Sequence, residues 1–378
     1  MQRPMDHDER LAAVRLHLTS GIGPRLYGAL VEHFGSAGAA AQAGAGALAE
    51  VQGIGSGRAE TIREGIAEAD PEAEIGKAES AGVRILIRGE PEYPVALTYL
   101  YDAPPILYVK GSLVPEDAQA MAIVGMRKCS LYGQDQAERL ASGLARTGFT
   151  IVSGLARGID SAAHRGALAA GGRTLAILGN GLASVYPPEN RGLAEAVIAR
   201  GALVSEFPMT VGPTAENFPR RNRILAAFGL GTIVVEAGRR SGSLITARLA
   251  AELGKEVFAV PNRVDAPGAA GVHALIRDGA KLIESVADVL DEFPDLGLAA
   301  PEGSDAAEQP ALPLRAGLSA EEARLVDALD GEPTPLDVLA SRAGLDAAKA
   351  SGALTLLELK GLVRALPGGR FVRRRSEG

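Results

Sequence analysis

The stretch FTIVSGLARGIDSAAH at residues 149–164 decides the fold of this chain. An apolar run, F-T-I-V, passes through Ser153 and Gly154 into a segment with the composition of a helix. Such a strand-to-helix junction is typical of α/β folds, in which the first N–H groups of the helix lack partners and favour an anion. The stretch FPRRNRILAAFGLGTIVVEAGRRSGSLITARL at 218–249 has the same character. Together they indicate a surface that takes several phosphates.

Outward from these stretches, apolar runs alternate with helical segments such as the one from about Gly133 to Arg146. Continuous apolar strands spaced by amphipathic helices predict an α/β fold with a Rossmann-like parallel sheet that is covered on both faces. Ligands of such sheets bind beyond the carboxyl ends of the strands. The expected strands are 83–87, 121–125, 149–152, 174–179, 202–206, 232–236, 256–261 and 281–283.

The N-terminal part, residues 1–80, is predicted to be a separate helical domain. Two phrases, SGIGPRLYGAL at 20–30 and VQGIGSGRAETI at 51–62, place an apolar residue between glycines before a helix start. This is the helix-hairpin-helix pattern, whose glycine turn lets backbone N–H groups approach a DNA phosphate. A helical bundle used for packing or for partner contact is the alternative.

The core is expected over 81–292, followed by a linker at 293–316 that contains four prolines: Pro294, Pro301, Pro310 and Pro313. Residues 317–378 then have the order helix, turn, helix and hairpin of a winged-helix domain, with a capping box from Ser319 to Glu322. Its second helix, near 346–360, carries few basic residues, so contact with protein or simple packing is as well supported as groove reading.

Composition places the chain among soluble globular proteins. Its 378 residues carry a net charge of −7, with no run of 18 apolar residues that could span a membrane. The first residues lack the apolar core of a signal peptide, and Cys129 stands alone, so a cytoplasmic location is expected. Residues 219–263 are locally basic, because eight Arg and Lys outnumber three Glu (8 − 3 = +5).

The loops after the predicted strands supply the candidate contacts. Glycines allow close approach of the backbone, arginines chelate phosphate and hydroxyls donate to it. The candidates for DNA binding are Arg127, Ser130, Ser153, Gly154, Arg157, Arg220, Asn222, Arg223, Ser241, Gly242, Ser243 and Thr246.

Each loop also admits a structural interpretation. GMRKCS at 125–130 can be an ordinary turn, and Ser241 or Ser243 can cap the next helix. Asp160 is expected to cap or to fix Arg157, and His164 to orient or pack, since no G-x-S-x-G elbow supports a hydrolase triad. Three arginines in a first helical turn oppose the helix dipole, which favours a bound anion over salt bridges to Glu206 or Glu216.

Several cofactor sites lack their sequence signals. There is no G-x-x-x-x-G-K-[ST] motif for ATP, no complete dinucleotide fingerprint and no Cys/His cluster for zinc. The sequence therefore predicts neither a cofactor nor a metal.

Seven phrases occur in the order of a known family. VGMRKCSLYG, SGLARGIDSAAHRGAL, GNGLASVYPPEN, SEFP, NFPRRNRI, RSGSLITARLA and FAVPN closely resemble the DNA-processing protein A (DprA/Smf) family from about 85 to 292. The flanks resemble the SAM/helix-hairpin-helix-like N-terminal and winged-helix C-terminal domains of some members. Met126 stands where many members have Ser or Thr, and Ala183 where Asp is common.

The resemblance implies a function that the spacing does not show. Members bind single-stranded DNA and load the RecA recombinase onto it, displacing or bypassing single-strand-binding protein, during natural transformation and homologous recombination. They act without known catalysis and form homodimers through the Rossmann-like core. The resemblance assigns the DNA pocket to Arg127, Ser153, Gly154, Arg157, Asn222, Arg223, Ser241, Gly242 and Ser243. With few aromatic residues (4%), phosphate contacts are expected to dominate over base stacking.

Two alternatives stay open. GLGTIVVE at 229–236 is loosely similar to the G-G-x-G-T-x-x-E loop of phosphoribohydrolases, although Glu236 follows Thr232 one residue too late. A protein adaptor without DNA affinity is the other alternative.

Overall fold

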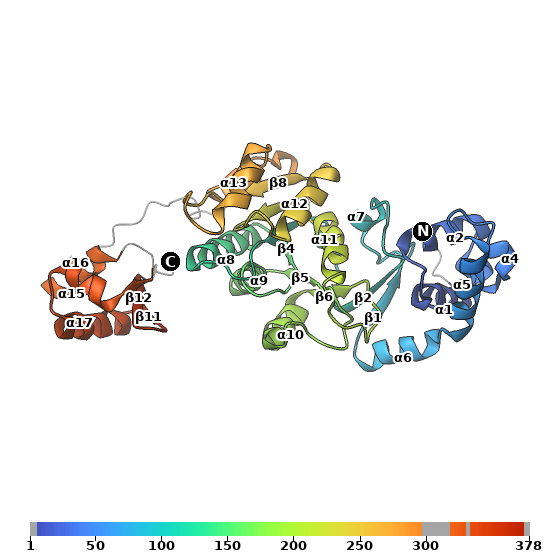
Figure 1. Cartoon of the computed structure of the whole chain (residues 1–378), viewed down its shortest axis with the longest axis horizontal. Coiled ribbons are helices and arrows are strands. Elements are labelled where there is room, and N and C mark those ends of the chain that lie inside the picture. The colour runs from blue at the N-terminus through green and yellow to red at the C-terminus, as the bar shows by residue number, and fades with distance from the viewer. Residues whose placement is uncertain (1–5, 297–317, 330–332, 374–378) are drawn as a thin grey trace. The chain divides into compact units, whose positions relative to one another are not determined.

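The computed structural model describes residues 6–296, 318–329 and 333–373. It divides into two compact units, 1–305 and 306–378, which are taken separately (Figure 1). Most of the expected linker, 297–316, lies outside the described residues.

Six helices open the first unit. The two Gly-Ile-Gly phrases form equivalent turns, with Gly21 and Gly53 at φ +84° and +88°, a backbone conformation that glycine adopts readily. Arg58 donates to both carbonyl oxygens, of Gly53 and of Gly21, at 2.9 Å each, so the two turns lie side by side. The helices are α1 (His7–Leu18), α2 (Pro24–Phe34), α3 (Ala37–Gln42), α4 (Ala45–Leu48), α5 (Ser56–Glu68) and α6 (Pro71–Ser80).

A nine-stranded sheet follows, in the order β1-β2-β6-β5-β4-β3-β7-β8-β9. The seven strands from β3 onward are parallel, as predicted, and β1 and β2 add an antiparallel edge. The strands are β1 (Arg84–Ile87), β2 (Ile106–Gly111), β3 (Ala120–Val124), β4 (Thr150–Ser153), β5 (Thr174–Ile177), β6 (Ala202–Ser205), β7 (Gly231–Val234), β8 (Glu256–Ala259) and β9 (Lys281–Leu282). All eight expected strands are present, and β2 was not predicted.

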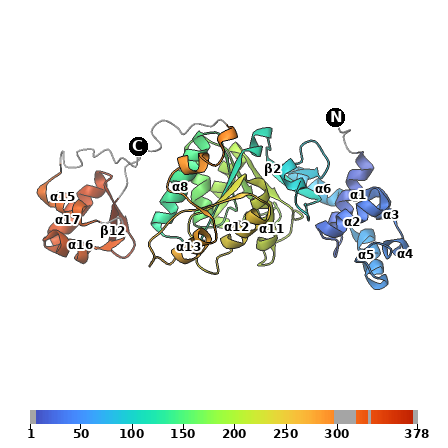
Figure 2. The same cartoon turned by 90° about the horizontal axis from the view of Figure 1, so that it is seen from above.

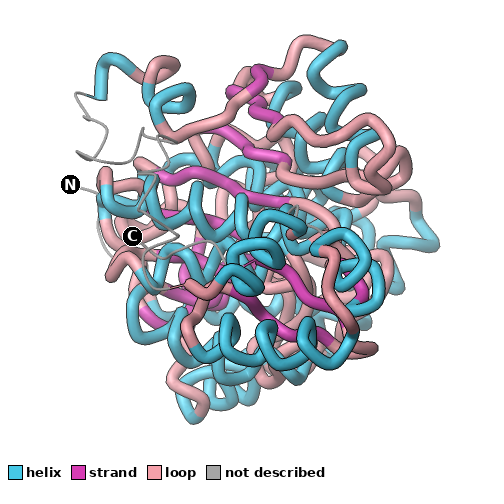
Figure 3. Tube along the Cα trace, turned by 90° about the vertical axis from the view of Figure 1, so that its left-hand side faces the viewer, coloured by secondary structure: helices cyan, strands magenta, loops and turns pink. Residues whose placement is uncertain are grey.

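Helices cover both faces of this sheet, whose strands run between them in Figure 3. Ile123, Ile151 and Ile233 pack against α8 and α9 on one face. Val124, Val152 and Val234 pack with α11 and α12 on the other, where Figure 2 shows these two helices side by side. The helices are α7 (Val95–Thr98), α8 (Leu131–Arg146), α9 (Ile159–Ala169), α10 (Arg191–Arg200), α11 (Asn217–Phe228), α12 (Ser243–Glu252), α13 (Ala269–Arg277) and α14 (Ala287–Leu290), with short 3-10 turns at Pro115–Ala118, Pro188–Asn190 and Pro294–Leu296.

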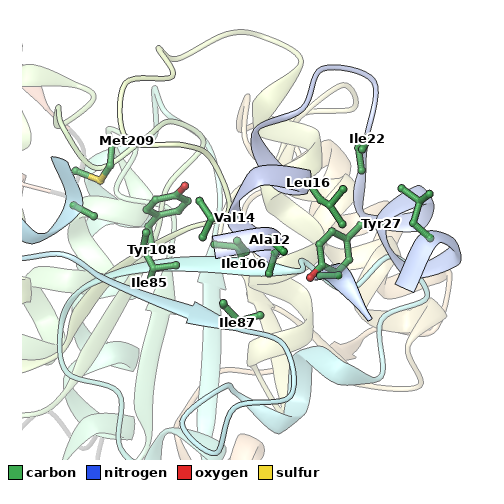
Figure 4. Close-up of a cluster of buried hydrophobic side chains, with 14 of the residues drawn as sticks. Ala12, Val14, Leu16, Ile22, Tyr27, Ile85, Ile87, Ile106, Tyr108 and Met209 are labelled. Carbon is green, nitrogen blue, oxygen red and sulfur yellow. The ribbon is translucent and has the colours of Figure 1, made fainter. Parts of the chain in front are cut away.

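The N-terminal helices and the sheet share one hydrophobic cluster. Figure 4 shows Tyr108 of β2 with Val14 of α1 on one side and Met209 on the other. Glu74 of α6, only 4% exposed, accepts the Met209 N–H at 2.6 Å. The domain boundary predicted at residue 80 therefore falls inside one compact unit, where helices and sheet are packed together.

The second unit has the predicted winged-helix order. Ser319 and Glu322 form the expected capping box, and Lys360 donates to Glu322 at 2.7 Å. Leu325, Leu339, Leu354 and Leu357 fill its core. Its elements are α15 (Ala320–Ala328), β10 (Thr334–Pro335), α16 (Leu336–Ala343), α17 (Ala347–Leu359), β11 (Val363–Leu366) and β12 (Arg370–Arg373).

Candidate nucleic-acid interface

The sheet has a topological switch point between β3 and β7. Strands β4, β5 and β6 continue from one side of β3, and β7, β8 and β9 continue on the other. In open α/β sheets, the loops beyond the carboxyl ends of such strands form the ligand crevice. Here a hollow of about 400 Å³ lies at this place. Its lining is Arg127, Tyr186, Pro213, Thr214, Ala215, Phe218, Pro219, Asn222, Gly242 and Ile245.

An arginine and two aromatic rings stand at the centre of this surface. The Arg127 guanidinium lies over the Phe218 ring, 4.7 Å from its centroid, and the Tyr186 and Phe218 rings are 6.0 Å apart. A smaller adjoining hollow shares these three residues and adds Gly154 and Arg157. An exposed cation over an aromatic face offers charge to a phosphate and a π-surface to a base.

The three arginines at the start of α11 have different environments. Arg220 is exposed and lies over the Phe207 ring at 5.0 Å. Arg221 is 5% exposed and donates to the Ile177 carbonyl at 2.9 Å. Arg223 is 8% exposed and pairs with Glu206 and, at 3.3 Å, with Asp102. The salt bridge to Glu206 that was set against a bound anion is therefore present for Arg223.

Burial controls the ionisation of this region. Desolvation lowers the pKa of Arg221 and raises the pKa of Asp160, which faces it. Burial also raises the pKa of Glu206, against the opposing effect of the Arg223 charge. The residues that carry these charges are at most 8% exposed, so solvent screens them little.

The glycine at 154 is required by Arg221. A Cβ placed there would lie 1.6 Å from the Arg221 Nη1 atom, so any other residue would displace the guanidinium. Gly154 therefore makes room for a buried arginine, in addition to lining the smaller hollow.

Two expectations for the neighbouring helix α9 have opposite outcomes. Asp160 accepts the Ala156 N–H at 3.3 Å, whereas Arg157 pairs with Glu189, so the prediction that Asp160 fixes Arg157 is wrong. The reason is that Asp160 is buried, whereas Arg157 is exposed and pairs at the surface with Glu189, which is also exposed. His164 is confirmed as a packing residue: it is fully buried and its Nδ1 lies 2.7 Å from the Thr174 hydroxyl.

The candidate hydroxyls make hydrogen bonds to other groups of the protein. Ser153 is buried and donates to the Ile123 carbonyl at 2.7 Å. Ser130 caps α8, accepting the Gly133 N–H at 3.0 Å, and its hydroxyl donates to Glu236. Thr246 is 1% exposed.

The start of α12 agrees in part with the capping prediction. Gly242 occupies the N-cap and has no side chain to cap with, but the Ser241 hydroxyl accepts the N–H of Ser243, the first residue of the helix, at 3.4 Å. The two serine hydroxyls also lie 2.7 Å from each other, so they are hydrogen-bonded within the loop. Gly242 is exposed, lines the hollow, and accepts from the Asn222 amide at 3.4 Å.

Glu236 has a structural role. Its carboxylate accepts the Ser130 N–H at 2.9 Å, the Ser130 hydroxyl, and the Asn262 amide at 3.0 Å, and the side chain is 2% exposed. Glu236, the glutamate of the phosphoribohydrolase alternative, therefore links the loops after β3 and β8 through hydrogen bonds.

Sequence reasoning missed the apolar part of the hollow. Tyr186, Phe218 and Ile245 line it, as do Pro213, Thr214 and Ala215 from the loop before α11. The position of Phe218, two residues before the arginine run, was the available signal, but the low aromatic content favoured phosphate contacts over base stacking.

Comparison with known proteins agrees with this arrangement. The family described as DNA recombination-mediator protein A matches residues 84–294, and the DprA winged-helix domain matches 307–369. Protein Smf of Escherichia coli is 42% identical over 289 residues, covering 75% of this chain and 76% of its own. The chain belongs to the DprA/Smf family. DNA processing protein DprA of Streptococcus pneumoniae is 44% identical over 201 residues, which cover 53% of this chain and 71% of its own.

Solved structures of the family superpose on this one. The DprA crystal structure from Streptococcus pneumoniae has a TM-score of 0.66 at 33% identity, covering 76% of this chain and 99% of its own. A structure from Helicobacter pylori, described as giving insight into the single-stranded DNA binding mode of DprA, has a TM-score of 0.51 at 29% identity, covering 56% of this chain and 96% of its own. The Rossmann-like core and the winged-helix domain predicted from the sequence are thus confirmed.

Membrane-spanning helices and clustered metal ligands are both absent from the part of the chain that the structure describes. None of the helices in 6–296, 318–329 and 333–373 is long and apolar enough to cross a membrane. Within the same ranges, no group of three or more His, Cys, Asp or Glu side chains is arranged to hold a metal ion.

Proposed function

We propose that this member of the DNA recombination-mediator family binds single-stranded DNA in the hollow at the β3–β7 switch point. The observation that carries the proposal is the Arg127 guanidinium over the Phe218 ring in a hollow that Asn222 and Gly242 also line. Single strands expose both phosphates and base faces, and duplex DNA hides its base faces, so this pairing favours the single strand. The single-stranded DNA binding mode described for the Helicobacter pylori relative supports the same ligand.

The predicted contacts divide according to burial and to internal hydrogen bonds, since Ser130 is exposed and Ser241 half-exposed but both hydroxyls are engaged within the protein. We propose that the exposed or half-exposed residues Arg127, Arg157, Arg220, Asn222 and Gly242 contact the strand directly. The engaged residues keep those contacts in place: Ser130 and Ser153 through hydrogen bonds, Arg223 through its acidic partners. Gly154, Ser241, Ser243 and Thr246 shape the loops that carry them.

The resemblance to the family extends the proposal to partners. We propose that the bound strand is passed to the RecA recombinase during recombination and natural transformation, in the cytoplasm, by a homodimer that displaces or bypasses single-strand-binding protein. A binding role requires no chemistry at the site, and we propose no catalytic residue and no cofactor.

Fluorescence anisotropy of a labelled oligonucleotide over a salt series tests DNA binding. We expect a preference for single strands over duplex and a log–log salt slope that falls by about 0.7 when Arg127→Ala removes one phosphate contact. Arg146→Ala is the matched control, because Arg146 is exposed at the opposite end of α8, where it binds the Ser142 hydroxyl. Loss of affinity in both variants alike would exclude this site, and no binding by the parent would exclude it and favour the adaptor alternative.

RecA loading needs its own assay. With single-stranded DNA coated by single-strand-binding protein, the parent should shorten the lag of RecA ATP hydrolysis, and Arg127→Ala should not. If the parent binds the strand but leaves the lag unchanged, the proposed DNA binding stands and the proposed RecA loading is excluded.

A further inference from the structure

A second aromatic surface lies on the segment between α7 and β2. Tyr99 is 79% exposed and Tyr101 is 84% exposed, and they are the exposed aromatic side chains among the large hydrophobic residues of the described chain. Exposing two rings on one short segment keeps apolar area in water, which is unfavourable unless a ligand covers it.

This segment is fixed to the helix that lines the hollow. Leu97 and Leu100 pack in the same cluster as Ile224 and Phe228 of α11, which runs beside α7 (Figure 1). Asp102, the residue after Tyr101, pairs with Arg223 at 3.3 Å, and this ion pair neutralises the negative charge of Asp102. Because Arg223 directly follows the hollow residue Asn222, the tyrosine segment meets α11 within about one helical turn of the hollow.

The tyrosine segment repeats the chemistry of the hollow. The Arg25 guanidinium, from the first turn of α2, lies over the Tyr101 ring at 4.6 Å from its centroid. The corresponding distances are 4.7 Å for Arg127 over Phe218 and 5.0 Å for Arg220 over Phe207. Two of these three arginine–aromatic pairs involve α11, and the third stands on the segment bound to it. A series of such pairs is the pattern that single-stranded nucleic acid requires, a cation for each phosphate and a ring for each base.

We infer that Tyr99, Tyr101 and Arg25 form a stacking platform for unpaired nucleobases of a strand that extends out of the hollow. The inference rests on the proposed function, since it adds a second subsite to the same strand. The ligand class is an unpaired nucleotide: Arg25 takes the phosphate, and the exposed tyrosine faces take the bases.

The chain contains no tryptophan, which gives the platform a direct reporter. A Tyr101→Trp variant carries one indole, whose fluorescence falls when a base stacks on it. We expect quenching by an oligothymidylate of about 20 nucleotides and not by one of about 5 nucleotides, which fills the hollow alone. A strand of about 20 nucleotides with abasic sites in its outer part should bind without quenching.

Affinity gives an independent readout. Stacking contributes about 1–3 kcal/mol per base, so the loss of two stacked bases in Tyr99→Ala/Tyr101→Ala should weaken binding of the long strand by at least about 30-fold and leave the short strand unchanged. The Tyr99→Phe/Tyr101→Phe variant keeps both rings and should bind as the parent does. Val95→Ala is the matched control, because Val95, on the adjoining helix α7, is 66% exposed and carries no ring.

The outcomes separate the platform from the hollow. If the parent binds the short strand and the double alanine variant binds the long strand normally, the platform is excluded while the proposed function stands. Equal weakening for both strands would also overturn it, since the tyrosines would then act on the hollow. If the parent binds neither strand, the proposed function fails, and the platform with it.

Discussion

Replacing Arg223 by methionine should destabilise the protein far more than it weakens DNA contact. The side chain is 9% exposed, and its partner Glu206 is 2% exposed. Without the guanidinium, the Glu206 carboxylate stays buried, with its second oxygen already lacking a hydrogen-bond partner. Removing one member of a buried ion pair costs about 3–5 kcal/mol, because the other charge is left uncompensated.

The expected shift in melting temperature follows from the size of the unit. Unfolding entropy is about 2.1 cal/mol/K per residue, so a unit of about 300 residues gives about 0.6 kcal/mol per degree. A loss of about 3–5 kcal/mol then lowers Tm by about 5–8 °C, measured by scanning calorimetry. Because Asp102 is 31% exposed and can be hydrated, most of this loss is assigned to Glu206.

A double variant distinguishes burial from DNA contact. Arg223→Met combined with Glu206→Leu removes both charges and should recover most of the lost Tm, since apolar residues replace buried pairs at little cost. A single Arg223→Met variant that melts within about 1 °C of the parent, yet binds single-stranded DNA about tenfold more weakly, would refute the argument and make Arg223 a direct contact.

Three further predictions address the packing around the site. Burial lowers the pKa of His164 from 6.5 to about 3, so on acidification His164 is protonated in the unfolded chain before it is protonated in the folded protein. Urea melts should therefore show that the free energy of unfolding falls as pH drops below about 6.5, by up to about 1.4 kcal/mol per pH unit, and His164→Leu should flatten this slope. Glu74→Ala removes the charged acceptor of a loop N–H and should cost about 1.5–3 kcal/mol in the same assay, whereas Glu74→Gln, which keeps an acceptor, should recover at least half. Gly154→Ala places a Cβ against the Arg221 guanidinium and should lower both Tm and strand affinity. Gly192→Ala is the control and should raise Tm slightly, because Gly192 lies in helix α10 with open space where the Cβ would be. Equal changes in Tm for the two variants would contradict the crowding argument.

The parallel sheet was predictable because its strands are continuous apolar runs. A-I-V in β3 and T-I-V in β4 are buried on both faces, and each is followed by glycine or serine and a helix. The strand β2 escaped prediction although Ile106, Leu107 and Val109 are fully buried. It pairs antiparallel with β1 and β6, so no crossover helix frames it.

The site was predictable at the level of loops and not of side chains. Glycines and arginines after β3, β4 and β7 located the hollow, since parallel strands end at one edge. Which arginine faces solvent depends on helix phase. Arg221 stands three and four residues before Ile224 and Leu225, on the buried face, and this periodicity was available in the sequence. The partnership of Arg223 with Asp102 was not, because the two residues are far apart in the sequence.

Three arginines at the start of α11 were expected to oppose the helix dipole and so to favour a bound anion, but two of them are compensated within the protein. Arg223 is compensated by Glu206 and Asp102, and Arg221 by the charge of Asp160. The Arg127 charge nevertheless lowers the pKa of Arg221, so these two cations repel each other beneath and beside the hollow. A phosphate next to Arg127 would relieve that repulsion, while an uncharged ligand would not. If the hollow binds the strand as proposed, the buried arginine contributes to anion binding through its field, without contacting the strand, and an acidic chain can keep a locally positive hollow.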